Sequence, residues 1–538
     1  MGVSYTAPLN DMRFLLRELA GLAQISKLPG CEEATPELAD AVLEEAGKFA
    51  AGVLAPLNHI GDRAGCRLED GKVLTPEGWA DAYRQFAAGG WVGLGLWPEY
   101  GGQGLPKSVA TPVLEMWCSA NMAFTMLPQL CPGETEAIRL AGSDNLKSTY
   151  LEKLVTGEWA CTMNLTEPQA GSDLSAIRTR AEPQADGSYR ISGQKIFISY
   201  GDHDITPNIV HLVLARLPDA PPGVKGISMF LVPKYLVNAD GSLGKRNDVR
   251  CVGLEHKLGI NGSPTCAMSF GENGEDTDGD SRGAAGWIVG EPNRGLEYMF
   301  VMMNDARFGV GVQGIGLGER AYQQALAFAR ERVQGRDAVS GAVGQPIISH
   351  PDVKRMLLSM RARIMAARAV AYTAAGWFDV ARHSADKEAA AKARRYVDLL
   401  MPVVKGWSTE SCQQVCYDAI QIHGGMGFVE ETGIAQHYRD ARIITIYEGT
   451  TGIQANDLVG RKILRENGAT LRELIVDVRT IVAQLAKADG LQSMAARLEE
   501  DVAVLERALD WILANGKDHL AAVLAGAVPF LHLLGSVC

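Results

Sequence analysis

The sequence predicts an α+β protein of several domains, with helical regions on either side of a central β-rich region. Three observations carry this prediction. Helical periodicity changes at about residue 161 to short β-type runs, and it returns after Gly295. A composition break at 460–470 then precedes further helical sequence. We therefore expect an N-terminal helical domain at 1–160, a central β-domain at 161–290, a C-terminal helical bundle at 291–465 and an additional helical region at 466–538.

In the first two domains, local signals support these assignments. Residues 9–155 alternate helical segments with short breaks, and one Ala-rich helix begins at Thr35 and Pro36, which suit a cap and a first-turn proline. The β-region contains runs such as YRISGQKIFIS and GISMFLVP, separated by Gly, Pro, Asp and Asn. The acidic, glycine-rich stretch 271–286 lacks EF-hand spacing, so we expect a solvated connection between strands and not a calcium loop.

The region after Gly295 contains long amphipathic segments that are typical of bundle helices. Four glycines (Gly309, Gly311, Gly314 and Gly316) lie in a helical context, where we expect them to allow close helix packing and not to form a nicotinamide-nucleotide motif. The chain ends in an apolar helical stretch, which must pack on the body of the protein, on a partner or against further residues.

Composition favours a protein that acts on small molecules. A chain of 538 residues is long enough for roughly three or four domains, and 47% hydrophobic with 21% charged residues is typical of globular proteins. The formal net charge of -11 argues against binding to a phosphate backbone, because such binding depends on clustered Lys and Arg.

The ten cysteines contain no C-x-x-C pair and no His/Cys cluster at metal spacing, so we expect neither a disulfide framework nor a metal site. Cys412 and Cys416 stand four residues apart, and we interpret them as small buried residues. The N-terminus lacks the basic and apolar pattern of a signal peptide, and no apolar run has the length of a membrane span. We therefore expect a cytoplasmic location.

Three segments contain residues suited to chemistry. The run MNLTEPQAGSDL (163–174) offers backbone N–H groups and hydroxyls of the kind that a flavin edge and a pyrophosphate require, although such a run is often only a turn. Phe197 and Ser199 share one face of a strand by alternation, where an aromatic is usually core. Glu448 lies between Tyr447 and a glycine; it could be a solvated turn residue, but this setting suits a desolvated base with a raised pKa.

In this order, these segments and others resemble the acyl-CoA dehydrogenase family over nearly the whole chain. The motifs that carry the resemblance are PEYGGQG (98–104), TEPQAGSD (166–173), KLGINGSPT (257–265), QIHGGMGF (421–428), RDARI (439–443) and IYEGTTGIQ (446–454). The opening YTAPLNDMRFLL (5–16) and the sequence beyond residue 465 are similar to the subfamily of longer enzymes that includes 3-methylmercaptopropionyl-CoA dehydrogenase.

The resemblance implies a central β-barrel-like domain, a C-terminal four-helix bundle and FAD-dependent α,β-dehydrogenation of an acyl-CoA thioester to the trans-2-enoyl-CoA. Glu448 is then the catalytic base, and the substrate is 3-methylmercaptopropionyl-CoA or a short-to-long straight-chain acyl-CoA. The implied partners are an electron-transferring flavoprotein as electron acceptor and a second copy of the chain in a homodimer. The homodimer prediction rests on the extra helices at 466–538, which we expect to cover the face that compact members use to form tetramers.

The resemblance also implies which residues contact FAD and the substrate. The FAD contacts are Met163, Leu165, Thr166, Gly171, Ser172, Phe197, Ile198, Ser199, Arg332, Gln334, Gln421, Gly424, Gly425, Thr450 and Gly452. The substrate contacts are Ser172, Asn304, Arg307, Tyr447, Glu448 and Gly449. Arg332, Gln334 and residues 421–425 are implied to act across the dimer interface. Glycine at 452 replaces a longer polar side chain of compact members, so a contact there must come from the backbone.

Alternatives remain open at this point. Some branches of the family carry the base one residue before the arginine of NDARFG, but in this chain that residue is Ala306, which leaves Glu448 as the matching base. A related acyl-CoA oxidase would use the same half-reaction and pass electrons to oxygen. A non-catalytic acyl-CoA-binding scaffold is a further alternative, which the presence of Glu448 and the flavin segments opposes.

Overall fold

The computed structural model describes residues 5–272 and 283–538, which form two compact units. The helical unit comprises the chain up to Lys48, Pro106–Ser119 and Arg307–Cys538, and the sheet unit comprises Phe49–Leu105 and Ala120–Ala306. Most of the stretch 271–286, expected to be a solvated connection, lies outside the described residues. Within the described ranges no helix is long and apolar enough to cross a membrane. The domain bounds expected from the sequence stay a prediction.

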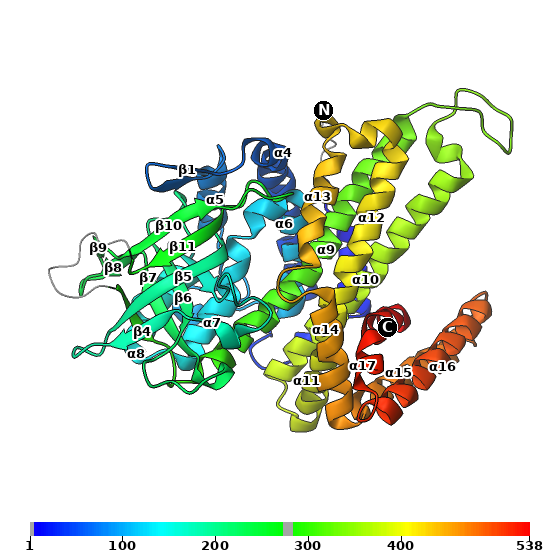
Figure 1. Cartoon of the computed structure of the whole chain (residues 1–538). Helices are drawn as coiled ribbons and strands as arrows, with labels where there is room; N and C mark the ends of the chain where they lie inside the picture. Colours follow the sequence, from blue (N-terminus) through cyan, green and yellow to red (C-terminus); the bar gives the residue numbers. More distant parts are fainter. Residues whose placement is uncertain (1–4, 273–282) are drawn as a thin grey trace. The chain divides into compact units, whose positions relative to one another are not determined.

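The sheet unit is organised around one large, mostly antiparallel sheet with strand order β10-β11-β5-β12-β7-β6-β3, and β4 pairs with β5 outside this path. Only the β3–β6 pairing among these is parallel. Figure 1 shows these strands side by side in green and cyan. The strands are β3 (Ala160–Asn164), β4 (Arg180–Pro183), β5 (Tyr189–Ser199), β6 (Ile209–Ala215), β7 (Ser228–Pro233), β10 (Val249–Leu254), β11 (Thr265–Phe270) and β12 (Ala284–Ile288).

Strands β6 and β7 form the centre of this unit because both are apolar runs that are buried at every position. Their inward side chains pack with those of β5 and β11 around Phe230 and Phe270. Two short hairpins pair β1 (Arg67–Glu69) with β2 (Lys72–Leu74) and β8 (Tyr235–Val237) with β9 (Leu243–Arg246). The first hairpin interrupts a region that the sequence predicts to be mostly helical. The helices of the unit are α4 (Ala55–Ala64), α5 (Trp79–Ala88), α7 (Cys131–Ala141) and α8 (Asp144–Val155).

Three helices contribute residues to both units, although α3 (Pro36–Phe49) contributes only its last residue, Phe49, to the sheet unit. Helix α6 (Lys107–Thr125) leaves helical geometry at Asn121, one residue after the division between the units, and α9 (Gly295–Glu331) is divided after Ala306. Helix α9 begins at the glycine where helical periodicity returns in the sequence. Helix α3 (Pro36–Phe49) begins as expected, because the Leu38 amide donates to the Thr35 hydroxyl at 3.2 Å.

The helical unit has long helices that approach each other closely where glycines remove the side chain. A Cβ on Gly311 would lie 2.4 Å from the Val404 carbonyl, and one on Gly316 would lie 2.8 Å from the Glu115 carbonyl. The expected packing role is therefore confirmed for Gly311, Gly314 and Gly316, and it stays a prediction for Gly309. The helices are α1 (Leu9–Glu18), α2 (Leu22–Ile25), α10 (Pro351–His383), α11 (Lys387–Pro402), α12 (Ser408–His423), α13 (Ile434–Ile444), α14 (Thr451–Asp457), α15 (Ala469–Leu485), α16 (Gln492–Asn515), α17 (Leu520–Ala525) and α18 (Ala527–Val537).

The last four helices, α15 to α18, form the extra region at the C-terminus. Figure 1 shows α15 and α16 side by side in orange and red. Helix α15 packs on α11, where Arg395 donates to Glu473 at 2.9 Å and Lys392 donates to Asp477 at 3.1 Å. A Cβ on Gly535 in α18 would lie 2.4 Å from the Trp407 ring, so the apolar end of the chain packs on the body of its own unit.

A buried charge cluster connects three helices of this unit. The Arg368 side chain has no solvent exposure and donates to Glu115 at 2.6 Å and to Glu319 at 2.8 Å. Tyr372 donates a further hydrogen bond to Glu115 at 2.8 Å. Each carboxylate is thus paired, which is the condition under which charges are tolerated in a protein interior.

We expect Arg368→Ala to destabilise the protein by about 3–5 kcal/mol, because it leaves two buried carboxylates without their cation. The measurement is the shift of the guanidinium denaturation midpoint, followed by circular dichroism. Arg497→Ala is the matched control, since Arg497 is 72% exposed in its pair with Asp501 and its loss should cost less than about 1 kcal/mol. Equal midpoints for the two variants would contradict the structural role of the cluster.

Candidate active site

Glu448 lies in a tight turn between α13 and α14, where its backbone adopts a positive φ of 55°. The next residue, Gly449, has a φ of 85°. A left-handed conformation costs a non-glycine residue of order 1 kcal/mol or more, and such conformations persist where the surroundings enforce them. The turn therefore holds the Glu448 side chain in a direction that a relaxed loop would not maintain.

Side chains from two helices enforce this turn. The Gln454 amide donates to the Glu448 carbonyl at 3.0 Å, and the Lys405 ammonium donates to the Gly449 carbonyl at 2.6 Å. Thr450 then caps α14, because its hydroxyl accepts from the Ile453 amide. Both carbonyls of the turn are thus occupied by fixed donors.

The electrostatic setting of Glu448 combines desolvation with two nearby cations. Burial raises the pKa of the carboxyl, and Arg307 and Lys405 oppose that rise. Burial lowers the pKa of Lys405 to about 8, against the effect of Glu448 and Glu410. Burial also lowers the pKa of Arg307. A carboxylate in this setting is less solvated than in water yet retains partners for its charge.

Lys405 is a functional residue that the sequence interpretation missed. It lies fully buried in a π-helical turn, η7 (Val403–Trp407), between α11 and α12. π-Helical turns inside longer helices are frequent at functional sites. The sequence feature that could have identified it is a lone lysine in the apolar run MPVVKGW. Such a lysine is expected to be buried, and a buried ionisable group without a structural ion pair is a candidate functional residue.

Tyr447, the neighbour of Glu448, points into the helical unit and donates a hydrogen bond to Gln313 on α9. Burial raises the pKa of this phenol well above its usual value, so it stays protonated. Arg307 precedes Gln313 on the same helix. Residues of α9, η7 and the α13–α14 turn therefore meet around Glu448 within one unit.

The sheet unit contains the second group of expected site residues, at the end of β3 and along β5. Thr166 follows β3, and its carbonyl accepts from the Ile196 amide of β5 at 2.9 Å. The segment that follows β3 and the end of β5 are therefore joined at Thr166 and Ile196, between the expected contacts at 163–172 and those at 197–199. Gly171 and Ser172 are exposed in the loop that follows.

A buried ion pair fixes the start of this loop. The Lys195 ammonium, which has no solvent exposure, donates to the Glu167 carboxylate at 2.8 Å and to the Leu165 carbonyl at 3.0 Å. Glu167 also accepts from the Thr179 hydroxyl at 2.6 Å. Burial alone raises the pKa of Glu167, but Lys195 and the hydrogen bonds bring it to about 2, so the pair is ionised. The sequence interpretation did not single out either charged residue.

Phe197 shows how β5 departs from simple alternation. It has a φ of 60°, and the β5–β11 register shifts between Cys266 and Met268. A positive φ is unusual for a bulky residue, and here it marks a bulge. Phe197 is 59% exposed at this bulge and Ser199 is half-buried, so the aromatic residue is not part of the core.

The remaining expected contacts lie at helix ends of the helical unit. Arg332 and Gln334 are exposed just after α9, and Gln421, Gly424 and Gly425 are exposed at the end of α12. Thr450 and Gly452 lie at the start of α14, beside Glu448. Asn304 belongs to the sheet-unit part of α9 and is exposed. The expected site residues are thus divided between the two units.

Family models match most of the chain. They are the acyl-CoA dehydrogenase N-terminal domain at residues 36–158, the middle domain at 162–272 and the C-terminal domain at 293–464. A fourth model, the acetyl-CoA dehydrogenase C-terminal-like domain, matches residues 474–538.

Individual proteins agree with these models. The chain is 49% identical to 3-methylmercaptopropionyl-CoA dehydrogenase of Ruegeria pomeroyi over 99% of this chain and 89% of that protein. It is 35% identical to a broad-specificity linear acyl-CoA dehydrogenase of Mycobacterium tuberculosis over 99% of this chain and 88% of that protein. A solved acyl-CoA dehydrogenase from Bacillus anthracis, complexed with FAD, shares the fold with a TM-score of 0.73 and 22% identity, over 95% of this chain and 82% of that one.

These matches confirm the fold class expected from the sequence, including the extra C-terminal helices, and they establish FAD as the cofactor. The chain belongs to the acyl-CoA dehydrogenase family and is an FAD-dependent oxidoreductase.

Proposed function

We propose that the protein catalyses α,β-dehydrogenation of an acyl-CoA thioester with Glu448 as the base that removes the α-proton. The observation that carries this proposal is the setting of Glu448, whose carboxyl is desolvated in an enforced left-handed turn beside Arg307 and Lys405. Desolvation raises the pKa of the carboxyl and strengthens the carboxylate as a base, and the two cations oppose that rise. Bound FAD would supply the acceptor for the hydride that leaves the β-carbon.

The same turn supplies a second element of the reaction. A thioester α-proton is weakly acidic, so negative charge that develops on the thioester oxygen must be stabilised. In this proposal the backbone N–H of Glu448 donates to that oxygen. The bonds from Gln454 and Lys405 to the neighbouring carbonyls fix this peptide in advance, which avoids reorganisation during proton removal.

The residues of the sheet unit fit a flavin. The exposed Phe197 offers an aromatic surface. The loop after Thr166 offers exposed backbone groups and the Ser172 hydroxyl, and the bond from Lys195 to the Leu165 carbonyl holds the start of this loop in place. We propose that residues 163–172 and 197–199 contact the isoalloxazine and phosphates. Within the same proposal, Arg332, Gln334, Gln421, Gly424, Gly425, Thr450 and Gly452 contact the nucleotide portion.

The proposal also covers the identity of the acyl group in the substrate. The relative from Ruegeria pomeroyi is named for 3-methylmercaptopropionyl-CoA, and the relative from Mycobacterium tuberculosis for linear acyl-CoAs. The higher identity favours a short sulfur-containing acyl group for this chain. We propose that Asn304, Arg307 and Ser172 hold the CoA portion, and that Tyr447 and Gly449 contact the thioester.

The assembly and the electron acceptor remain part of the same proposal. An electron-transferring flavoprotein is the acceptor that the family resemblance implies. The homodimer rests on the extra helices, which pack on α11 of their own unit. A cytoplasmic location and a role in β-oxidation stay predictions from the sequence.

We expect Glu448→Gln to keep FAD and to bind acyl-CoA, because the amide is nearly isosteric with the carboxyl. Reduction of the flavin by substrate should fall by about four orders of magnitude, since the variant has no base at the α-carbon. Stopped-flow bleaching of the flavin absorbance measures this step. Bleaching at a near-normal rate would remove Glu448 from the mechanism.

We expect Lys405→Met to move the acid limb of the pH–rate profile for flavin reduction to higher pH. The base must be ionised to act, and the loss of a cation that lowers the pKa of Glu448 lets that pKa rise further. The measurement is the reduction rate as a function of pH. Lys405→Arg keeps the charge and should return the limb toward its original position; identical profiles for Met and Lys at position 405 would contradict this tuning role.

We expect Lys195→Met to weaken FAD binding by roughly tenfold or more, because it leaves Glu167 buried without its cation and frees the Leu165 carbonyl. FAD content after dialysis and an FAD titration of the apoprotein measure the effect. Lys153→Met is the control in the same unit, since its pair with Glu158 is half exposed. Equal FAD affinity in both variants would show that the ion pair does not support the flavin loop.

A further inference from the structure

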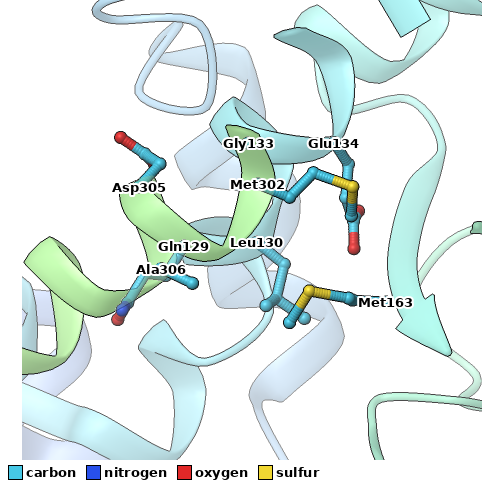
Figure 2. Close-up of a pocket in the computed structure, with 8 residues that line it drawn as sticks. All are labelled: Gln129, Leu130, Gly133, Glu134, Met163, Met302, Asp305 and Ala306. Carbon is cyan, nitrogen blue, oxygen red and sulfur yellow. The ribbon is translucent and has the colours of Figure 1, made fainter. Parts of the chain in front are cut away.

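The sheet unit contains a small pocket at the start of α7, and Figure 2 shows the residues that line it: Gln129, Leu130, Gly133, Glu134, Met163, Met302, Asp305 and Ala306. The pocket has room for about one water molecule, so it cannot hold a substrate group. Burial raises the pKa of the Glu134 carboxyl to about 8, against a lowering effect of the Cys161 thiol. None of these lining residues is Lys or Arg, and a carboxyl buried in this way is neutral at pH 7.

The half-buried carboxylate of Glu410 has a different setting, in the helical unit. Glu410 lies in α12, and it accepts a hydrogen bond from the Thr451 hydroxyl at 2.6 Å. Thr451 is the first residue of α14, and its amide donates to the Thr445 carbonyl, directly after α13, at 3.1 Å. Glu410 therefore holds the residue that closes the turn containing Glu448.

Glu410 and Lys405 belong to one continuous helical run, in which the π-helical turn η7 lies between α11 and α12. In an ordinary α-helix, side chains five residues apart point in directions that differ by about 140°. A π-helical turn joins residues five apart by its hydrogen bonds, so it brings such residues closer to one face. Both side chains reach the same short segment, because Lys405 donates to the Gly449 carbonyl at 2.6 Å and Glu410 accepts from Thr451.

We propose that Glu410 is a positioning residue whose carboxylate holds the Glu448 turn through Thr451 and offsets part of the Lys405 charge at that turn. The inference rests on the proposed function, in which Glu448 is the base. Lys405 and Glu410 bind positions 449 and 451, which directly follow the base, so one cation and one anion from a single helical run fix this part of the turn.

Electrostatics give Glu410 the second part of this role. Glu448 and Glu410 both oppose the lowering of the Lys405 pKa by burial, so Lys405 interacts with both carboxylates. A negative charge beside Lys405 offsets part of the field that this cation exerts on Glu448. Removal of the Glu410 charge should therefore favour the ionised form of Glu448 and lower its pKa.

Other ionisable groups take part in the same electrostatic network of the helical unit. Asp457, at the end of α14, and Arg461, in the π-helical turn η10 (Leu458–Ile463), act on Glu448 through Arg307. The ionisable groups that face one another around the turn are Arg307, Lys405, Glu410, Asp440, Tyr447, Glu448, Asp457 and Arg461. Among them, Glu410 combines an interaction with Lys405 and a hydrogen bond to the turn itself.

The test separates the charge of Glu410 from its hydrogen bond. Glu410→Gln keeps an oxygen that accepts from Thr451 and removes the charge, so the acid limb of the pH–rate profile for flavin reduction should move to lower pH by about half a unit. This direction is opposite to that expected for Lys405→Met. Asp398→Asn is the matched control, because Asp398 lies in the same helical run and is 63% exposed beside Lys462, so its acid limb should stay in place.

Thr451→Val removes the hydrogen bond and keeps the charge. The rate of flavin reduction at the plateau of the profile should fall by about tenfold, because the turn loses a bond to a charged acceptor, while the acid limb stays in place. Thr451→Ser restores the hydroxyl and should restore the rate. Stopped-flow bleaching of FAD-loaded enzyme measures both variants. A merely structural role of Glu410 would not move the acid limb in one variant and the plateau in the other.

An acid limb of Glu410→Gln at the native position overturns the inference and leaves the proposed function intact. In the Lys405→Met background, Glu410→Gln should move the limb much less, and an equal shift there also overturns the inference. Near-normal bleaching in Glu448→Gln overturns the proposed function, and the inference with it.

Glu410→Asp covers the case in which Glu410→Gln does not retain FAD. The shorter side chain keeps the charge and withdraws from Thr451, so its plateau rate should fall as in Thr451→Val, with the acid limb in place. A native plateau rate in both Glu410→Asp and Thr451→Val overturns the positioning role.

Discussion

The desolvation of Glu448 beside two cations is the constraint on which the rest of the structure depends. A carboxyl buried alone would remain protonated, and one in full contact with water would be a weak base. The intermediate setting needs an arginine from α9, a lysine from η7 and a turn between α13 and α14 to meet within one unit. Three helical segments far apart in the sequence must therefore be held with little freedom.

Close helix packing provides that restraint. Gly311 and Gly314 let α9 approach the backbone at Val404, within the π-helical turn that carries Lys405, and at Ser408, directly after that turn. A side chain at either glycine would push this turn away and would move the lysine from the Gly449 carbonyl. The small residues thus act on the turn through packing, while the Arg368 cluster connects α6, α9 and α10 with paired charges.

The sequence predicted features that depend on local patterns and short motifs. The order of helical and β-rich regions, the start of α3 at Thr35 and the packing role of the glycines follow from periodicity, capping and residue size. Lys405, Lys195 and Glu134 could not be found in this way, because their importance comes from burial and from partners distant in the sequence. The bulge at Phe197 could not be predicted from the sequence either, because the alternation of residue types along a strand does not reveal a shift in strand register.

These three buried ionisable residues differ in how far the protein itself satisfies them. The Lys195 ammonium donates to the Glu167 carboxylate and to the Leu165 carbonyl, so its function is to hold the loop after β3 in place. The Lys405 ammonium donates to one carbonyl, that of Gly449, and its positive charge interacts with the Glu448 carboxyl. Glu134 has only the Cys161 thiol beside it, and burial raises the pKa of its carboxyl to about 8.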